Sequence, residues 1–155
     1  MNKLTIELVP RTCWYSNVRS EVSSQEWDKI KLAVSSKAGR MCEICGGRGP
    51  KWPVECHEVW DYNDKTKTQT LARMIALCPS CHEVKHIGLA SIKGREEIAA
   101  THLAKVNQMS LQDAKQYIRE SFEKWYERSE HQWKLDLSAL SEYGITPSKT
   151  RKGIT

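Results

Sequence analysis

The sequence contains no apolar run of the roughly 18 residues that a membrane-spanning helix needs. Its first residues, MNKLTIELVPRTCWY, also lack the apolar block and the small-residue cleavage site of a signal peptide. Both absences predict a chain that stays in the cytoplasm, where thiols are reduced. The six cysteines are therefore expected to be metal ligands or free thiols rather than disulfides.

Phenylalanine is scarce, with one residue against six Trp and five Tyr. This composition favours aromatic rings that are buried while their N–H or O–H group forms a hydrogen bond. Acidic residues are the minority among the charges, since 24 Lys and Arg face 19 Asp and Glu and leave a formal net charge of +5. This mild basic excess is compatible with a nucleic-acid partner but does not require one. A chain of 155 residues is long enough for one domain with its own core.

Periodicity and turn residues predict a single α+β domain over residues 1–147, followed by a flexible basic tail at 148–155. A strand is expected at residues 4–9, where the pattern alternates before Pro10. Ser23 and Glu26 have capping-box spacing, which predicts a helix that opens at Ser24 and ends near Gly39.

The middle of the chain has the pattern of a β-hairpin followed by a short helix. Polar and apolar residues alternate over 52–62 as in a strand, NDKT is a turn, and residues 68–77 are expected to form the returning strand. A short helix is expected within 79–88, with Gly88 past its end. Beyond it, two helices are expected at 94–107 and 111–125, and residues 133–140 as a closing strand or a docked extension.

Two Cys-x-x-Cys pairs flank the expected hairpin: Cys42 with Cys45, and Cys78 with Cys81. A hairpin brings its ends together, so the pairs can offer four thiolates to one tetrahedral ion, which predicts a structural Zn²⁺ site. The CPSCH stretch also matches the attachment pattern of c-type haem, but haem attachment needs export and leaves Cys42 and Cys45 unexplained. The remaining cysteines, Cys13 and Cys56, are expected to be small buried hydrophobes.

Three of the five histidines fall at informative positions. His57 lies within the first hairpin strand, and His82 and His86 are spaced to share one face of the short helix. A zinc site between strand and helix would bring these imidazoles together as a second metal site with open positions, which suits catalysis. His102, on an apolar helix stripe, and His131, near a helix end, are expected to be structural.

The stretch CEICGGRGPKWPVECHEVW, followed by LARMIALCPSCHEVKH, resembles the HNH nuclease motif in its zinc-braced form. The resemblance covers residues 42–88. It implies the ββα-metal fold, in which a β-hairpin and a helix surround one divalent cation, flanked here by the N-terminal strand and helix and by C-terminal helices. It also implies an endonuclease that cuts DNA phosphodiester bonds, with a structural Zn²⁺ and a catalytic Mg²⁺, Mn²⁺, Ni²⁺ or Zn²⁺.

The resemblance implies a catalytic site made of His57, Glu58, His82 and His86. His82 matches the last histidine of the motif, and His86 matches an extra ligand of the colicin-like branch. At the first histidine region the family has an adjacent pair, a metal ligand and a general base. Here that pair is His57 with Glu58, or Cys56 with His57.

Two features depart from the family pattern. Adjacent strand residues point to opposite faces, so Glu58 can join His57 only through a bulge, and Glu55 is the alternative partner. The family's middle Asn is replaced by Arg73, with Asn63 and Gln69 as nearby substitutes.

Basic residues near the motif are candidates for phosphate contact, namely Lys85, Arg73, Arg48 and Lys51. The competing interpretation is a non-catalytic zinc-ribbon module that binds nucleic acid or a protein partner. One tightly held ion per chain would favour the binding module, and a second, weaker ion would favour the nuclease.

Overall fold

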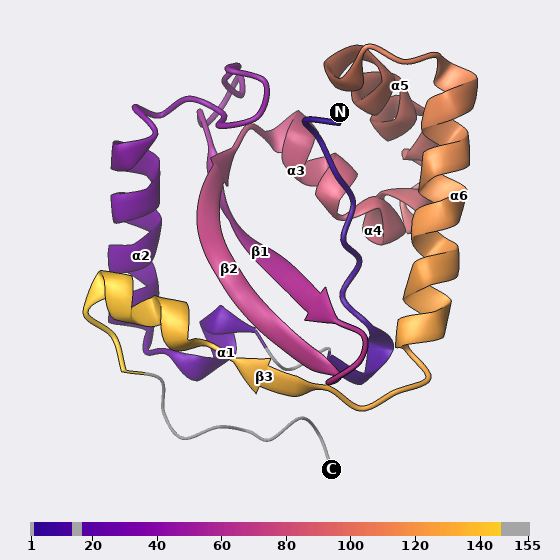
Figure 1. The fold of residues 1–155 in the computed structure, drawn as a ribbon. Helices are drawn as coiled ribbons and strands as arrows, with labels where there is room; N and C mark the ends of the chain where they lie inside the picture. Colours follow the sequence, from indigo (N-terminus) through magenta and orange to yellow (C-terminus); the bar gives the residue numbers. More distant parts are fainter. Residues whose placement is uncertain (1, 14–16, 147–155) are drawn as a thin grey trace.

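The computed structural model describes residues 2–13 and 17–146, which form an α+β fold with helices on both sides of a small sheet (Figure 1). The predicted basic tail at 148–155 lies outside these residues. The elements follow in the order η1 (Arg11–Cys13), α1 (Val18–Glu21), α2 (Ser24–Lys37), β1 (Glu55–Asn63), β2 (Thr68–Leu77), α3 (Pro79–Lys85), α4 (Ile87–Ile92), α5 (Glu96–Asn107), α6 (Leu111–Arg128), β3 (Lys134–Asp136) and η2 (Ser138–Tyr143).

The predicted hairpin is confirmed as the antiparallel pair β1 and β2. β3 pairs in parallel with the start of β2, so the strand order is β1-β2-β3 and β1 lies at one edge of the sheet. The closing segment is thus a short strand continued by the η2 turn. A bulge shifts the register between Val59 and Trp60, while residues 55–58 keep regular pairing with residues 74–77.

The helix α2 begins at Ser24 as predicted. The hydroxyl of Ser23 accepts a hydrogen bond from the Glu26 amide at 3.1 Å, and the Ser23 amide donates to the Glu26 carboxylate at 2.8 Å. This reciprocal pair satisfies amides that have no partner within the helix. Gly39 follows the helix at φ +62, a conformation that costs glycine little.

The predicted strand at residues 4–9 is wrong, because the backbone there pairs with side chains instead of with another strand. The Leu4 amide donates to Asn107 Oδ1 at 2.8 Å, and the Ile6 amide donates to the Tyr117 hydroxyl at 3.0 Å. Leu4 and Ile6 are still buried, so the alternation marks an extended segment laid across α5 and α6.

The predicted short helix is confirmed as α3, with Gly88 past its end, but a second short helix follows it directly. α3 ends at Lys85, only His86 leaves helical geometry, and α4 resumes at Ile87. Gly88 therefore lies inside α4, where an added Cβ would meet nothing within 4 Å. The two long helices are confirmed as α5 and α6, and two of their apolar residues, Ile98 and Leu111, are exposed.

Hydrophobic side chains gather on both faces of the sheet. One cluster lies between the sheet and α3–α6 and includes Ile75, Leu77 and Val84. The other lies between the opposite face, α2 and η2, and includes Val34, Trp60 and Leu140. The sheet is therefore a shared wall, with α3 on one side of β1 and α2 on the other.

Candidate metal centres

The two cysteine pairs converge as predicted. The sulfur atoms of Cys42, Cys45, Cys78 and Cys81 all lie within 4.8 Å of one another, and Cys45 Sγ is 3.6 Å from Cys78 Sγ. Sulfurs held at about 2.3 Å from a tetrahedral ion would be about 3.8 Å apart. The donor set and its spacing are compatible with a structural zinc site. We call these residues the four-cysteine cluster.

Local turns orient these sulfurs. In the first pair, Gly46 adopts φ +76 in a tight knuckle, and the Cys45 amide donates to Cys42 Sγ at 3.5 Å. In the second pair, Cys78 is the N-cap of α3, and its sulfur accepts a hydrogen bond from the Cys81 amide at 3.4 Å. Amide donors favour ionised thiols, so both turns prepare sulfur for a cation.

The thiols of the cluster influence one another strongly. A hydrogen bond from Cys81 lowers the pKa of Cys42 to about 4, whereas the same contact, followed by burial, raises the pKa of Cys81. Crowded sulfurs cannot all ionise together without a positive charge among them. A divalent ion removes this conflict, because a coordinating thiol is deprotonated.

His102, which the sequence analysis assigned to a structural role, lies against this cluster. Its Nε2 is 3.2 Å from Cys81 Sγ, so the ring can donate a hydrogen bond to a ligand sulfur. The packing of α5 against α3 creates this contact. The position of His102 on an apolar stripe carried no sequence signal for it.

The three predicted imidazoles also converge. Ligand atoms of His57, His82 and His86 lie within 4.8 Å of one another, and the Nε2 atoms of His82 and His86 are 3.0 Å apart. Two nitrogens at about 2.1 Å from one ion and at right angles would be about 3.0 Å apart. The same pair of atoms can share a proton, but its spacing equals that of two adjacent metal ligands. We call these residues the three-imidazole group.

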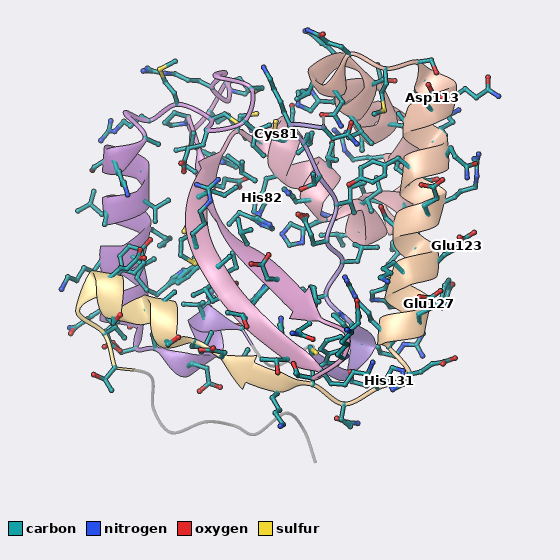
Figure 2. All side chains as sticks on the ribbon, in the orientation of Figure 1. Cys81, His82, Asp113, Glu123, Glu127 and His131 are labelled. Carbon is teal, nitrogen blue, oxygen red and sulfur yellow. The ribbon has the colours of Figure 1, made fainter. Side chains whose placement is uncertain are left out.

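Glu55 orients one ring of this group. Its Oε1 lies 3.0 Å from His82 Nδ1, and both side chains are less than half exposed. A carboxylate on Nδ1 holds the proton there and leaves the Nε2 lone pair facing His86. Figure 2 shows His82 directed from α3 toward the hairpin, with Cys81 one residue earlier.

The structure does not bring Glu58 to the three-imidazole group. Its Oε2 accepts a hydrogen bond from the Val18 amide at 2.8 Å, on the face of β1 opposite His57. The bulge that would have joined Glu58 to His57 falls between Val59 and Trp60 instead, so residues 57 and 58 keep opposite directions. Burial raises the pKa of Glu58. Of the two carboxylates weighed from the sequence, Glu55 is the one that contacts a histidine.

Burial disfavours the charged form of two of the three rings, His57 and His86. It lowers the pKa of His57 to about 2, with further lowering by His82, His86 and Lys85. The pKa of His86 is lowered for the same main reason but less far, since part of its ring reaches the surface. Neutral imidazole is the form that binds metals, so at pH 7 protons compete little with an ion for His57 and His86.

The structure does not present Lys85 to a phosphate. Lys85 is 5% exposed, and its Nζ lies 3.0 Å from both Glu7 Oε2 and Thr5 Oγ1. The prediction failed because the N-terminal segment covers this face of α3 (Figure 1).

The other predicted phosphate contacts are at the surface. Arg73 forms an ion pair with Glu43 at 3.4 Å, Arg48 donates to the Gly39 carbonyl oxygen at 3.4 Å, and Lys51 is exposed.

The two proposed substitutes for the family's Asn have structural partners. Asn63 Oδ1 accepts hydrogen bonds from two amides of the hairpin turn, each at 3.0 Å. Gln69 is buried and its Nε2 donates to the Tyr62 hydroxyl at 3.4 Å. Neither contact involves the three-imidazole group.

Fold and site together define an α+β protein with a four-cysteine cluster compatible with zinc and, beside it, three convergent histidines. No protein-family model matches the chain, and neither a curated protein nor a solved structure matches it. Across residues 2–13 and 17–146, no helix combines the length and apolar character needed to cross a membrane.

Proposed function

We propose that this protein is a metal-dependent endonuclease of the HNH type that hydrolyses phosphodiester bonds in DNA. The observation that supports the proposal is the convergence of His57, His82 and His86 on a hairpin and helix joined by the four-cysteine cluster. An isolated pair of histidines at helical spacing would be ordinary. A third imidazole delivered by a different element to the same point is what a metal site requires.

The chemistry divides among named side chains. His82 and His86 would hold the ion, Glu55 would orient His82 through its Nδ1, and His57 would complete the ligand set or accept the proton of the attacking water. A bound divalent ion supplies positive charge to the phosphate and makes water more acidic. In the reaction a water oxygen bonds to phosphorus, the bond to the departing sugar oxygen breaks, and the proton removed from water is balanced by one given to that oxygen.

The ligand type bears on which ion is used. Three imidazole nitrogens favour later transition metals over Mg²⁺ by the usual affinity order. Activity is therefore expected to be higher with Mn²⁺ or Ni²⁺ than with Mg²⁺ at equal low concentration.

The proposal is tested by plasmid nicking with His57→Ala and His86→Ala in a series of Mg²⁺, Mn²⁺ and Ni²⁺. Both variants should retain one zinc per chain and lose nicking by about 100-fold or more. If His57 is a ligand, its variant also binds the second ion more weakly. If it is the base, ion affinity is unchanged. His131→Ala is the control, because His131 is exposed at the opposite end of the sheet from His82 (Figure 2). Nicking at the parent rate by both variants would show the assignment to be wrong.

A second candidate is a non-catalytic, zinc-containing module that binds nucleic acid or a protein partner. The position of Glu58 favours it, because this carboxylate, one of the candidates for the family's adjacent pair, accepts a hydrogen bond from the Val18 amide on the other face of β1. This candidate predicts one tightly held ion per chain and no nicking with any metal.

A further inference from the structure

A cavity of about 590 Å³ opens beside the three-imidazole group. Its walls come from α1, α2, the first residues of β1, β2 and α3, and His82 and Glu55 line it. Its volume lies within the range of about 300–1,000 Å³ that is usual for sites of small organic ligands. His82 is the member of the three-imidazole group that lines this cavity, and most of the other lining residues lie on the α2 side of β1, so the cavity meets the group at His82.

The wall formed by α2 and the chain that enters β1 combines apolar and polar side chains. Trp27 provides a partly exposed aromatic ring, and Leu32 and Val54 provide aliphatic surface. Leu32 is 65% exposed, so its aliphatic surface at this wall is open to solvent. The flat face of an indole ring can stack with another aromatic ring. Nucleobases stack on such side chains, and any of the bases can do so.

Charged side chains also line the cavity. Arg19 and Lys31 contribute positive charge, and Asp28 and Glu55 contribute carboxylates. Lys31 Nζ lies 3.1 Å from Asp28 Oδ1. The other carboxylate, Glu55, is bonded to His82. Arg19 is exposed at this cavity, where its guanidinium can contact a backbone phosphate.

We propose that this cavity binds a nucleobase of the strand that is cut, stacked against Trp27, with its phosphate at the three-imidazole group. The inference rests on the proposed nuclease function and names the substrate class: DNA with an unpaired base at the cleavage site. A base inside a duplex must be unstacked and unpaired before it enters, whereas an unpaired base enters at no such cost. Single-stranded, bulged or branched DNA is therefore preferred to uninterrupted duplex.

The test compares three substrates of one sequence: a single strand, a perfect duplex and a duplex with one unpaired base. The parent protein should cleave the first and third about tenfold or more faster than the second in Mn²⁺. Trp27→Leu should remove most of this preference, because it slows cleavage of the single strand and of the duplex with the unpaired base. Tyr126→Leu is the control, because Tyr126 is an exposed aromatic residue on α6, across the molecule from α2 (Figure 1).

Two measurements keep the test valid if Trp27→Leu folds poorly, since Trp27 also packs against the core. Arg19→Gln, a surface change, should weaken single-strand binding and reduce its salt slope by about one. In the parent protein, 5-bromodeoxyuridine at the unpaired position should photocrosslink to Trp27 in a chelating buffer that leaves zinc bound.

The outcomes separate the two proposals. Equal cleavage of all three substrates without a crosslink at Trp27 overturns the nucleobase site and leaves the nuclease standing. A Trp27 crosslink without cleavage in any metal supports the nucleobase site and overturns the nuclease. Strong cleavage of unpaired DNA that neither Trp27→Leu nor Arg19→Gln alters places the base elsewhere and overturns this assignment.

Discussion

His82 uses each of its two ring nitrogens for a different partner. Nδ1 faces Glu55 Oε1 at 3.0 Å, and Nε2 faces His86 Nε2 at 3.0 Å. A histidine ring alone can take either tautomer, and only one of them leaves Nε2 free for a metal. The carboxylate of Glu55 selects that tautomer, so its contribution to the site is made through His82 rather than by direct contact with an ion.

Glu55→Gln is therefore expected to weaken binding of the second ion by about tenfold, because removing an outer-shell carboxylate usually costs roughly 10- to 100-fold in affinity. Zinc content should stay at the parent value. Isothermal titration with Mn²⁺ or Ni²⁺ measures the affinity. The matched control is Glu58→Gln, which changes the neighbouring carboxylate on the opposite face and should leave the affinity unchanged. Equal affinities for parent and Glu55→Gln would contradict the role of Glu55.

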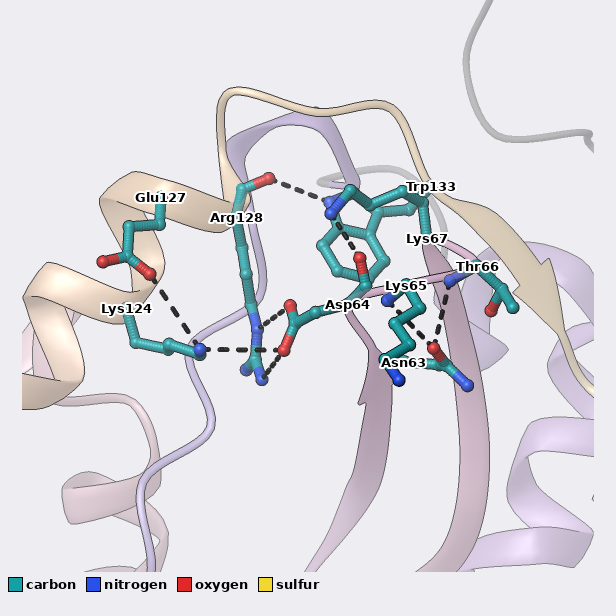
Figure 3. A network of polar contacts seen from close by, with 9 residues as sticks. All are labelled: Asn63, Asp64, Lys65, Thr66, Lys67, Lys124, Glu127, Arg128 and Trp133. Atoms are coloured by element: carbon teal, nitrogen blue, oxygen red, sulfur yellow. Dashed lines mark hydrogen bonds and ion pairs between the residues drawn. The ribbon is translucent and has the colours of Figure 1, made fainter.

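The hairpin is anchored at its tip as well as at its cysteine end. Asp64, in the turn between β1 and β2, receives two hydrogen bonds from Arg128 at 3.1 and 3.2 Å, and Lys124 lies 3.7 Å away (Figure 3). The Trp133 ring donates to the Arg128 carbonyl oxygen at 2.9 Å, which joins the start of β3 to the same point. These contacts fix the far end of the hairpin against the last turn of α6.

Asp64→Asn should lower the free energy of unfolding at pH 7 by about 0.5–1 kcal/mol, the size expected of a well-formed but partly exposed ion pair. Arg128 lowers the pKa of Asp64, with help from Lys124 and Lys67. The stabilisation is thus present at neutral pH and is lost as the pH falls through the lowered pKa of the folded state.

Urea unfolding of parent and Asp64→Asn from pH 7 down to pH 3 measures this difference. Glu127→Gln is the control, because the Glu127 carboxylate forms a longer ion pair, at 3.9 Å from Lys124 Nζ, and is largely exposed. A destabilisation by Asp64→Asn that stayed constant with pH would rule out the ion pair as its cause.

In the whole molecule, the four-cysteine cluster joins segments that are far apart in the sequence. Cys42 and Cys45 precede the hairpin, whereas Cys78 and Cys81 open α3, the helix that carries His82 and leads into His86. Three of these cysteines also belong to the buried cluster beneath α3–α6. An ion at the sulfurs would therefore hold α3 against the sheet and set the position of the three-imidazole group.

Cys81→Ser should release the zinc, lower the melting temperature markedly and abolish binding of the second ion, because structural zinc contributes roughly several kcal/mol to folding. Metal analysis, thermal unfolding and titration with Mn²⁺ follow the three effects. Cys56→Ser is the control, since the Cys56 thiol lies outside the cluster and burial raises its pKa to about 12. A Cys81→Ser protein with one zinc and the parent melting temperature would refute the site.

Local chemistry made several features predictable. The capping box of Ser23 and Glu26, the hairpin turn after Asn63 and the two cysteine pairs each depend on residues close together in the sequence. The strand expected at residues 4–9 was wrong because its alternation could not reveal that Asn107 and Tyr117 would take its amide groups. Lys85 was misjudged for the same reason, since Glu7 lies 78 residues away in the sequence.

The sequence by itself determined the donor atoms: four thiols at paired spacing, two imidazoles on one helix face and a third on a strand. Only the tertiary structure decided which carboxylate meets them, because a bulge placed after Val59 rather than before Glu58 leaves Glu58 pointing toward Val18 and Glu55 toward His82. A strand's pattern predicts that neighbours alternate, but the packing of α1, α2 and α3 around the sheet selects the face that each side chain finally occupies.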